Sequence, residues 1–338
     1  MTPSSPKEIP DPAGFHHITV LRAEVAEAVA AGVADRVQAA DAEAWVVDAT
    51  LGGGGHAEAI LVPCHTVRLL GLDRDPTALA AATVRLAPFG GRFTPVHARF
   101  GELVEVVATR GAGPLAAVVA DLGVSSHQLD TPERGFSFRN EGPLDMRMDP
   151  TRGQTVAELL AEVTLEDLAD VLYDYGDIRR SIGTARIVLQ SFQGGAVTTS
   201  ALAEKLAARL PRTRSMHPAT QVFQALRIWA NRELDELERL LADAPGLLAP
   251  GGVLAVISFH SGEDRLVKRA MQAQARRDGW LRRTKRSVMA SEAEQTQNPR
   301  ARSARLRVLQ RAPLAGLGTR QDGWDEEEEG EVDEGGQG

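Results

Sequence analysis

The sequence predicts an α/β fold in which a mostly parallel sheet is interrupted by a block of helices. Between residues 44 and 121, short valine-rich apolar runs alternate with segments of helical periodicity, which is typical of consecutive β-α units. Residues 125–149 are polar, and the segments from there to residue 217 have helical periodicity without intervening strands. Strand-like runs resume further along the chain. A chain of 338 residues is long enough for one large domain that carries such an insertion.

The predicted elements follow in a regular order. The first four strands are expected at Ala44–Asp48, Val67–Asp73, Phe93–His97 and Leu115–Asp121. Residues 125–149 are interpreted as a polar loop, and helices are expected after the capping sequence Thr164–Asp167, at Ile178–Phe192 and at Ser200–Leu210. The sheet is expected to resume at Gly252–Phe259 and to end at Arg305–Gln310.

Composition excludes several classes of protein. No stretch approaches the roughly 20 apolar residues that span a bilayer, so we expect a soluble, cytoplasmic protein. The single cysteine, Cys64, excludes an internal disulfide and a cysteine-rich zinc site. The histidines show no metal-ligand spacing, and no metal is expected.

The net charge of −8 is concentrated at one end of the chain. From residue 314 onward there are nine acidic residues and one basic residue, so the rest of the chain is neutral, and the tail is expected to be disordered. Residues 265–311 hold fourteen Lys and Arg residues against three acidic ones. This segment either neutralises nucleic-acid phosphates or forms a solvated surface, and the sequence leaves both open.

A glycine-rich turn follows the first predicted strand. Residues 52–57 match the G-x-G-x-x-A pattern of cofactor-binding turns, and Asp73 closes the next strand, where a carboxylate binds ribose hydroxyls. The pattern fits either a nicotinamide dinucleotide or S-adenosylmethionine. Asp48 precedes the turn and should disfavour a pyrophosphate, whereas S-adenosylmethionine carries an ammonium, a sulfonium and no phosphate. The sequence therefore favours S-adenosylmethionine.

The loop after the fourth strand is the expected substrate-facing segment. Methylation of an exocyclic amine needs an acceptor for its N–H, and Asp121 is a candidate, although it is equally suited to hold the cofactor's amino acid end. His260 is a second catalytic candidate, with a structural role favoured. Phe136 and Phe138 either stack on an unpaired base or form a small core.

Together these segments closely resemble one family, the bacterial 16S ribosomal RNA cytosine-N4 methyltransferases, known as RsmH or MraW. Besides the glycine turn, the resemblance rests on nine strings: His17–Leu21, Gly71–Pro76, Asp121–Ser126, Glu133–Phe138, Gly142–Pro150, His217–Thr220, Phe223–Trp229, Ser258–Ser261 and Asn298–Ser303. It covers the chain from Phe15 to about Arg311. Gly262 departs from it, because the family usually has leucine there.

The resemblance implies a class I, Rossmann-like methyltransferase with an inserted all-helical domain for substrate recognition. The expected domains are a methyltransferase domain (15–124 and 218–312) and the helical insertion (125–217), while a flexible N-terminus (1–14) and an acidic disordered tail (313–338) lie outside the resemblance. The implied substrate is N4 of the decoding-centre cytidine of 16S rRNA in the small ribosomal subunit. The implied cofactor contacts are Gly54, Gly55, His56, Asp73, Phe100, Asp121 and Gln128.

Two other functions remain open at this point. A nicotinamide-dependent oxidoreductase shares the glycine turn. A ribosome-assembly factor that has lost catalysis would share both the cofactor domain and the basic segment.

Overall fold

The computed structural model describes residues 19–40, 43–192, 197–211 and 217–313. Its centre is a seven-stranded sheet in the order β3-β2-β1-β4-β5-β7-β6. The first five strands are parallel, and β7 is antiparallel to both of its neighbours. The strands are β1 (Ala44–Asp48), β2 (Val67–Asp73), β3 (Phe93–His97), β4 (Leu115–Asp121), β5 (Leu248–Ser258), β6 (Trp280–Arg282) and β7 (Arg305–Arg311).

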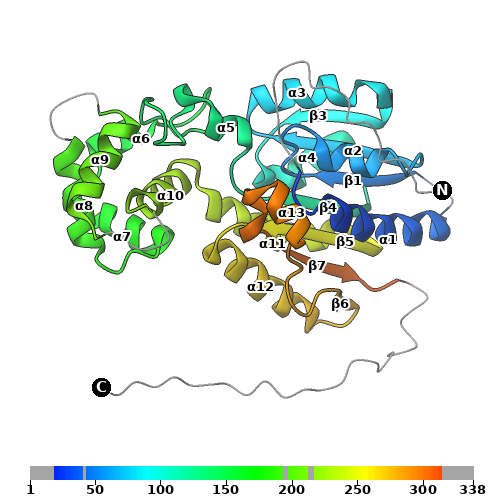
Figure 1. Cartoon of the computed structure of the whole chain (residues 1–338). Helices are drawn as coiled ribbons and strands as arrows, with labels where there is room; N and C mark the ends of the chain where they lie inside the picture. Colours follow the sequence, from blue (N-terminus) through cyan, green and yellow to red (C-terminus); the bar gives the residue numbers. More distant parts are fainter. Residues whose placement is uncertain (1–18, 41–42, 193–196, 212–216, 314–338) are drawn as a thin grey trace.

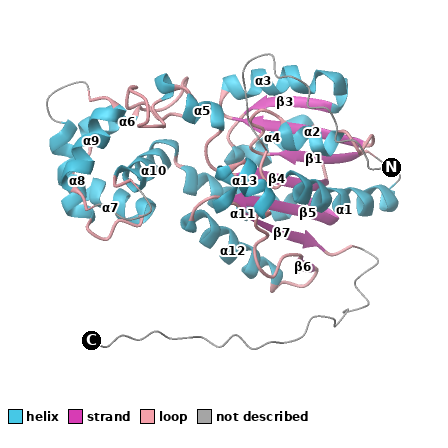
Figure 2. Cartoon of the chain, viewed as in Figure 1, coloured by secondary structure: helices cyan, strands magenta, loops and turns pink. Residues whose placement is uncertain are grey.

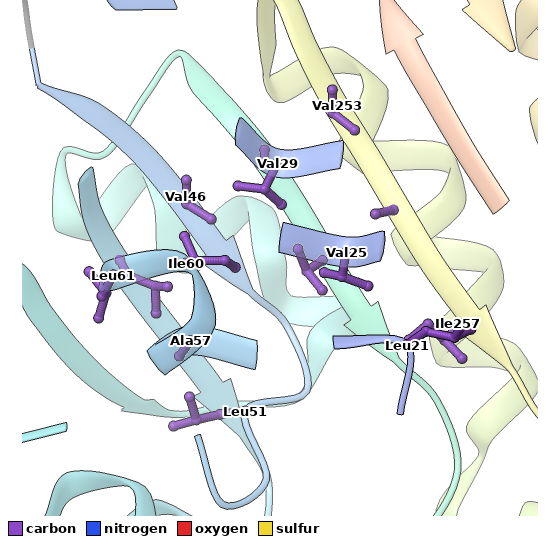
Figure 3. Close-up of a cluster of buried hydrophobic side chains, with 14 of the residues drawn as sticks. Leu21, Val25, Val29, Val46, Leu51, Ala57, Ile60, Leu61, Val253 and Ile257 are labelled. Carbon is purple, nitrogen blue, oxygen red and sulfur yellow. The ribbon is translucent and has the colours of Figure 1, made fainter. Parts of the chain in front are cut away.

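Helices cover both faces of this sheet (Figures 1 and 2). One face is covered by α1 (Arg22–Ala40), α2 (Gly55–Leu61) and α3 (Pro76–Leu86). The other is covered by α4 (Leu103–Arg110), α11 (Glu233–Leu247) and α12 (Ser261–Ala275). Figure 3 shows the first of the two cores, where Val25 and Val29 of α1 lie close to Val46 of β1 and Val253 of β5. A sheet buried on both faces explains why its strands are continuous apolar runs.

A separate group of helices extends from the sheet and has its own core (Figure 1). Its members are α6 (Val156–Glu162), α7 (Leu165–Gly176), α8 (Ser181–Phe192), α9 (Thr199–Arg209) and α10 (Ala219–Asn231). The predicted boundary at 217/218 stays a prediction, but α10, which lies beyond it, buries Val222 and Leu226 in this helical core. The predicted N-terminal segment and almost all of the acidic tail lie outside the described residues.

The first four strands have the predicted bounds. Several expectations were wrong in detail. The segment interpreted as a polar loop contains the helix α5 (Ser126–Asp130) and the short 3-10 helix η3 (Pro132–Arg134), and α8 begins three residues later than predicted. Strand β5 begins four residues before its predicted start and ends one residue earlier than predicted, and the bounds of α9 and β7 differ by one residue. The edge strand β6 was not predicted, because three residues are too few to show a period. The remaining short elements are η1 (Ala87–Arg92), η2 (Phe100–Glu102), α13 (Glu292–Gln297) and η4 (Pro299–Ser303).

Asn231, the last residue of α10, joins the helical group to the sheet. Its side-chain amide donates to Met146 O at 2.7 Å and accepts from Met148 N at 2.7 Å. Its backbone oxygen accepts a hydrogen bond from Arg74, which follows β2, at 2.8 Å. A single buried residue therefore connects α10, the segment before α6 and the carboxyl edge of the sheet.

Candidate active site

A cavity of about 290 Å³ opens at the carboxyl ends of the central strands. Strand order reverses between β1 and β4, and open α/β sheets bind ligands at such a switch point. The turn after β1 lines the cavity with Thr50 and Gly52, while β2 and β4 contribute their last residues, Asp73 and Asp121. The opposite wall comes from α10, α11, the start of α12 and η4.

The glycine turn has the conformation that its sequence predicts. Gly52 and Gly54 have left-handed backbones, with φ of +51° and +80°. A Cβ on Gly55 would collide with the Thr19 hydroxyl, so this position requires glycine for a different reason, a close approach. The cavity reaches the turn at Thr50 and Gly52, whereas Gly54 and Gly55 are buried beside it and do not line the cavity.

Asp73 is held in place by the turn. Its carboxylate accepts hydrogen bonds from Gly52 N at 2.7 Å and from Asp75 N at 2.8 Å. Burial raises the pKa of Asp73, and these two backbone donors oppose the rise. Phe100, in η2, lines the same side of the cavity, and the Arg74 guanidinium lies 5.4 Å from the centre of its ring. This end therefore offers a carboxylate beside an apolar surface.

Three titratable side chains meet where β1 and β4 end. Asp48 is fully buried, and His56 Nε2 lies 3.4 Å from Asp121 Oδ2 without the geometry of a hydrogen bond. Among the described residues, Asp48 Oδ2, Asp121 Oδ1 and both ring nitrogens of His56 have no hydrogen-bond partner. Buried polar atoms rarely stay unpaired, so unpaired carboxylate oxygens beside the cavity fit a cationic ligand such as S-adenosylmethionine.

Burial raises the pKa of Asp48 to about 6 from its ordinary value of 3.8, with His56 acting in the opposite direction. Because folding raises this pKa, Asp48 stabilises the protein at low pH, and the contribution is lost as the pH rises through about 6. In the cofactor-free protein, Asp48→Asn should therefore gain about 2 kcal/mol of stability relative to wild type between pH 4.5 and 7.5. Urea unfolding of both proteins at the two pH values measures this difference, and parallel pH profiles would contradict it.

Gln128 has a structural role that the sequence did not reveal. Ser125 and Gln128 form a capping box at the start of α5. The Gln128 amide donates to Asp75 Oδ2 at 2.9 Å, and Arg134 donates to the same oxygen at 2.8 Å. These contacts fix the loop after β4 to the start of α3, and Gln128 still lines the cavity.

The far wall contains charged residues that sequence reasoning missed. Arg227 of α10 donates to both carboxylate oxygens of Glu233 at 2.8 and 2.9 Å, and both side chains are largely buried. Glu263 of α12 is also buried and accepts from Phe259 N at 2.8 Å. Arg227 lies within the Phe223–Trp229 string, which was the available signal, but its partner lies across a helix boundary.

His260 lines the cavity and caps α12. Its ring nitrogen accepts from Glu263 N at 3.4 Å, and its Nε2 lies 3.1 Å from Glu263 Oε1. The structural role that the sequence favoured is present. Phe138 packs against Phe223 and His217, at ring distances of 5.0 and 4.8 Å. Phe138 and Phe136 thus belong to the helical core, which is the second of the two interpretations left open.

Of the seven expected cofactor contacts, the structure brings four together around the cavity: Asp73, Phe100, Asp121 and Gln128. Gly54, Gly55 and His56 lie next to it, at the start of α2. Within the described ranges, no group of three or more His, Cys, Asp or Glu residues is placed to hold a metal ion. No helix in the same ranges is long and apolar enough to span a membrane.

Comparison with known proteins identifies the family of this chain. The sequence profile described as the MraW methylase family matches residues 14–312. A ribosomal RNA small subunit methyltransferase H from Sorangium cellulosum (strain So ce56) is 47% identical over 309 residues, which cover 90% of this chain and 94% of that protein. Another from Synechococcus sp. (strain CC9311) is 50% identical over 274 residues, covering 79% of this chain and 86% of that protein. The chain therefore belongs to the MraW methylase family.

Proposed function

We propose that this protein transfers a methyl group from S-adenosylmethionine to N4 of the decoding-centre cytidine of 16S rRNA, in the cytoplasm and within the small ribosomal subunit. Relatives that match almost end to end are named ribosomal RNA small subunit methyltransferase H. The observation that carries the proposal is the cavity at the switch point. Asp73 lines the end that would hold the cofactor, polar residues line the far wall, and Asp121 lines the same cavity.

The residues present fit the cofactor. Asp73 would bind the ribose hydroxyls and Phe100 the adenine ring, with Gln128 holding the loop against them. Asp48 at the end of β1, with Gly54, Gly55 and His56 beside it, would hold the cationic amino acid end, which leaves Asp121 at the end of β4 for the substrate. When bound, S-adenosylmethionine supplies an activated methyl group on a sulfonium.

The chemistry at N4 needs an acceptor rather than a covalent nucleophile. The amine lone pair is delocalised into the ring, so nitrogen must become tetrahedral while its N–H is held. Asp121 Oδ1 has no hydrogen-bond partner in the described structure and lies at the cavity, so it would accept this hydrogen bond. Methylation at C5 would need a thiolate, but Cys64 lies just before β2, at the opposite edge of the sheet.

Arg227 would hold the base. Its Nε and Nη2 bind Glu233, and within the described residues its Nη1 makes no hydrogen bond. Gln224 lies one turn earlier on α10 and lines the same cavity. Cytosine presents the acceptors N3 and O2 beside its amine, and Arg227 would donate to them. Its pairing with Glu233 keeps a net positive charge away from the amine that must act as a nucleophile.

Methylation of undermodified subunits tests the proposal. Small ribosomal subunits from a strain that lacks the modification would be incubated with the protein and S-adenosylmethionine, and the nucleosides analysed by mass spectrometry. N4-methylcytidine at one site is expected. Only C5-methylcytidine, or no methylation of any particle form, would refute the proposal, and the second result with intact RNA binding would favour an inactive assembly factor. Calorimetry with NAD tests the oxidoreductase alternative directly.

The basic segment should contribute to RNA binding. Arg283, Lys285 and Arg286 are exposed beside β6, and Arg282 is half-buried. Replacing these four residues by glutamine should weaken RNA binding and lower the slope of log K against log salt by about 2 to 3. Binding measured between 50 and 200 mM salt gives this slope. An unchanged slope would indicate that the segment is a solvated surface that does not contact RNA phosphates.

A further inference from the structure

A second cavity, of about 450 Å³, lies between the helical group and the sheet. Five arginines line it, from both parts of the molecule, against two carboxylates, Asp149 and Asp235. We call it the arginine cavity. Arg74 also lines the first cavity, so the two are neighbours. The five arginines are Arg74, Arg99, Arg147, Arg152 and Arg232.

The arginines divide into those that are fixed and those that are available. Arg147 is bound by both oxygens of Asp145, at 2.7 and 2.8 Å, and Arg74 is buried. Arg152 is 51% exposed and 3.7 Å from Asp149, while Arg99 is 31% exposed and 3.5 Å from Glu236. These longer ion pairs leave guanidinium N–H groups for an incoming anion. One guanidinium group can donate two parallel N–H hydrogen bonds to the oxygens of a phosphate.

Arg232 is held in an unusual backbone conformation at the junction of α10 and α11. Its φ of +51° is in the left-handed region, which a residue with a Cβ rarely adopts. Its side chain is 62% exposed and 3.0 Å from Asp235. This conformation ends α10 and lets α11 begin at the next residue, so the helix junction fixes the position of Arg232 at the cavity.

Two aromatic side chains line the same cavity. Trp229 comes from the last turn of α10 and Tyr175 from the end of α7, and both are partly exposed. A site for a bare phosphate has no need of them. Arginines that bind phosphate, beside aromatic rings that can stack on a base, are the combination with which proteins bind single-stranded nucleic acid.

We propose that the arginine cavity binds the single-stranded RNA next to the target nucleotide. Arg99, Arg152 and Arg232 would bind its phosphates, and Trp229 with Tyr175 would stack on a flanking base. This inference rests on the proposed function, because it assumes that the nucleotide to be methylated enters the neighbouring cavity. Because Arg74 lines both cavities, the target nucleotide and the RNA next to it would bind in neighbouring sites.

RNA binding by single variants of the full chain tests this. The probe is a fluorescent single-stranded RNA oligonucleotide, compared with a duplex of the same sequence. Arg152→Gln should weaken binding of the single strand and lower its salt slope by about 0.7. The control is Arg68→Gln, which removes an arginine of similar exposure (44%) at the amino-terminal edge of the sheet and should change neither. Equal effects of the two variants would overturn the proposal.

The aromatic part has its own test. Trp229→Leu should weaken single-strand binding by about 5- to 100-fold, and Trp229→Phe should restore most of it, because a phenyl ring still stacks. Calorimetric affinity for S-adenosylmethionine should be unchanged in both, which shows that the fold is intact. If Phe does not rescue, or if inorganic phosphate displaces RNA at low millimolar concentration, the site is not a single-strand site. If these substitutions do not weaken single-strand binding while the wild-type protein methylates subunits, this inference is refuted and the proposed function is not.

Discussion

Asp121→Asn is expected to slow methyl transfer by about 10²- to 10⁴-fold, because the neutral asparagine oxygen is a weaker hydrogen-bond acceptor than a carboxylate and cannot take the proton that the amine loses when it is methylated. Single-turnover transfer to undermodified subunits measures the rate, and calorimetry measures the affinity for S-adenosylmethionine. The two measurements separate the two roles that the sequence left open. A slower rate at unchanged cofactor affinity assigns Asp121 to the amine, whereas a weaker cofactor affinity assigns it to the cofactor's ammonium group.

Asp170→Asn is the matched control. Asp170 is an exposed carboxylate on α7, in the helical group, and the same substitution there should leave both rate and affinity unchanged. A wild-type rate and affinity in Asp121→Asn would remove this carboxylate from the mechanism.

Glu233→Gln is expected to lower the free energy of unfolding by about 3 to 5 kcal/mol. Arg227 is then left in a largely buried position without the carboxylate that binds two of its nitrogens. Unfolding in urea, followed by circular dichroism, measures the loss. Replacing both residues, as Arg227→Met with Glu233→Leu, removes the uncompensated charge and should recover most of the stability.

The double variant also separates stability from base recognition. It should fold and bind S-adenosylmethionine, yet transfer methyl groups poorly, since Arg227 would no longer hold cytosine. Wild-type transfer by the stable double variant would show that the pair is structural only. An exposed pair, Arg232 with Asp235, offers a comparison, because breaking it should cost about 1 kcal/mol or less.

The sheet and its acidic edge could be predicted because both depend on local sequence. Strand β4 is a continuous apolar run that ends at Asp121, and burial on both faces produces such a run. The turn at Gly52 and Gly54 requires left-handed backbones, which glycine adopts most easily. Of the seven expected contacts, Asp73 and Asp121 end strands β2 and β4, and Phe100 lies three residues after β3, so the topology brings these three to one edge.

The far wall could not be predicted, because it depends on how separate helices pack. Arg227 and Glu233 are six residues apart but belong to two helices, and no helical period relates them. Glu263 reaches the same wall from α12. The helical core likewise takes in α10, which the pattern of the sequence placed with the sheet. His56 has no pattern of its own, and only the resemblance to a family drew attention to it.

The position of Asn231 has a consequence for the order of events in a reaction. All its side-chain polar atoms and its backbone oxygen are engaged, so α10 is fastened to the sheet before any RNA arrives. The helical group is then held against the edge of the sheet that would bind the methyl donor. Under the proposed function, the RNA would not have to close the helical group over the sheet, and its binding energy would remain available for drawing the target nucleotide into the cavity.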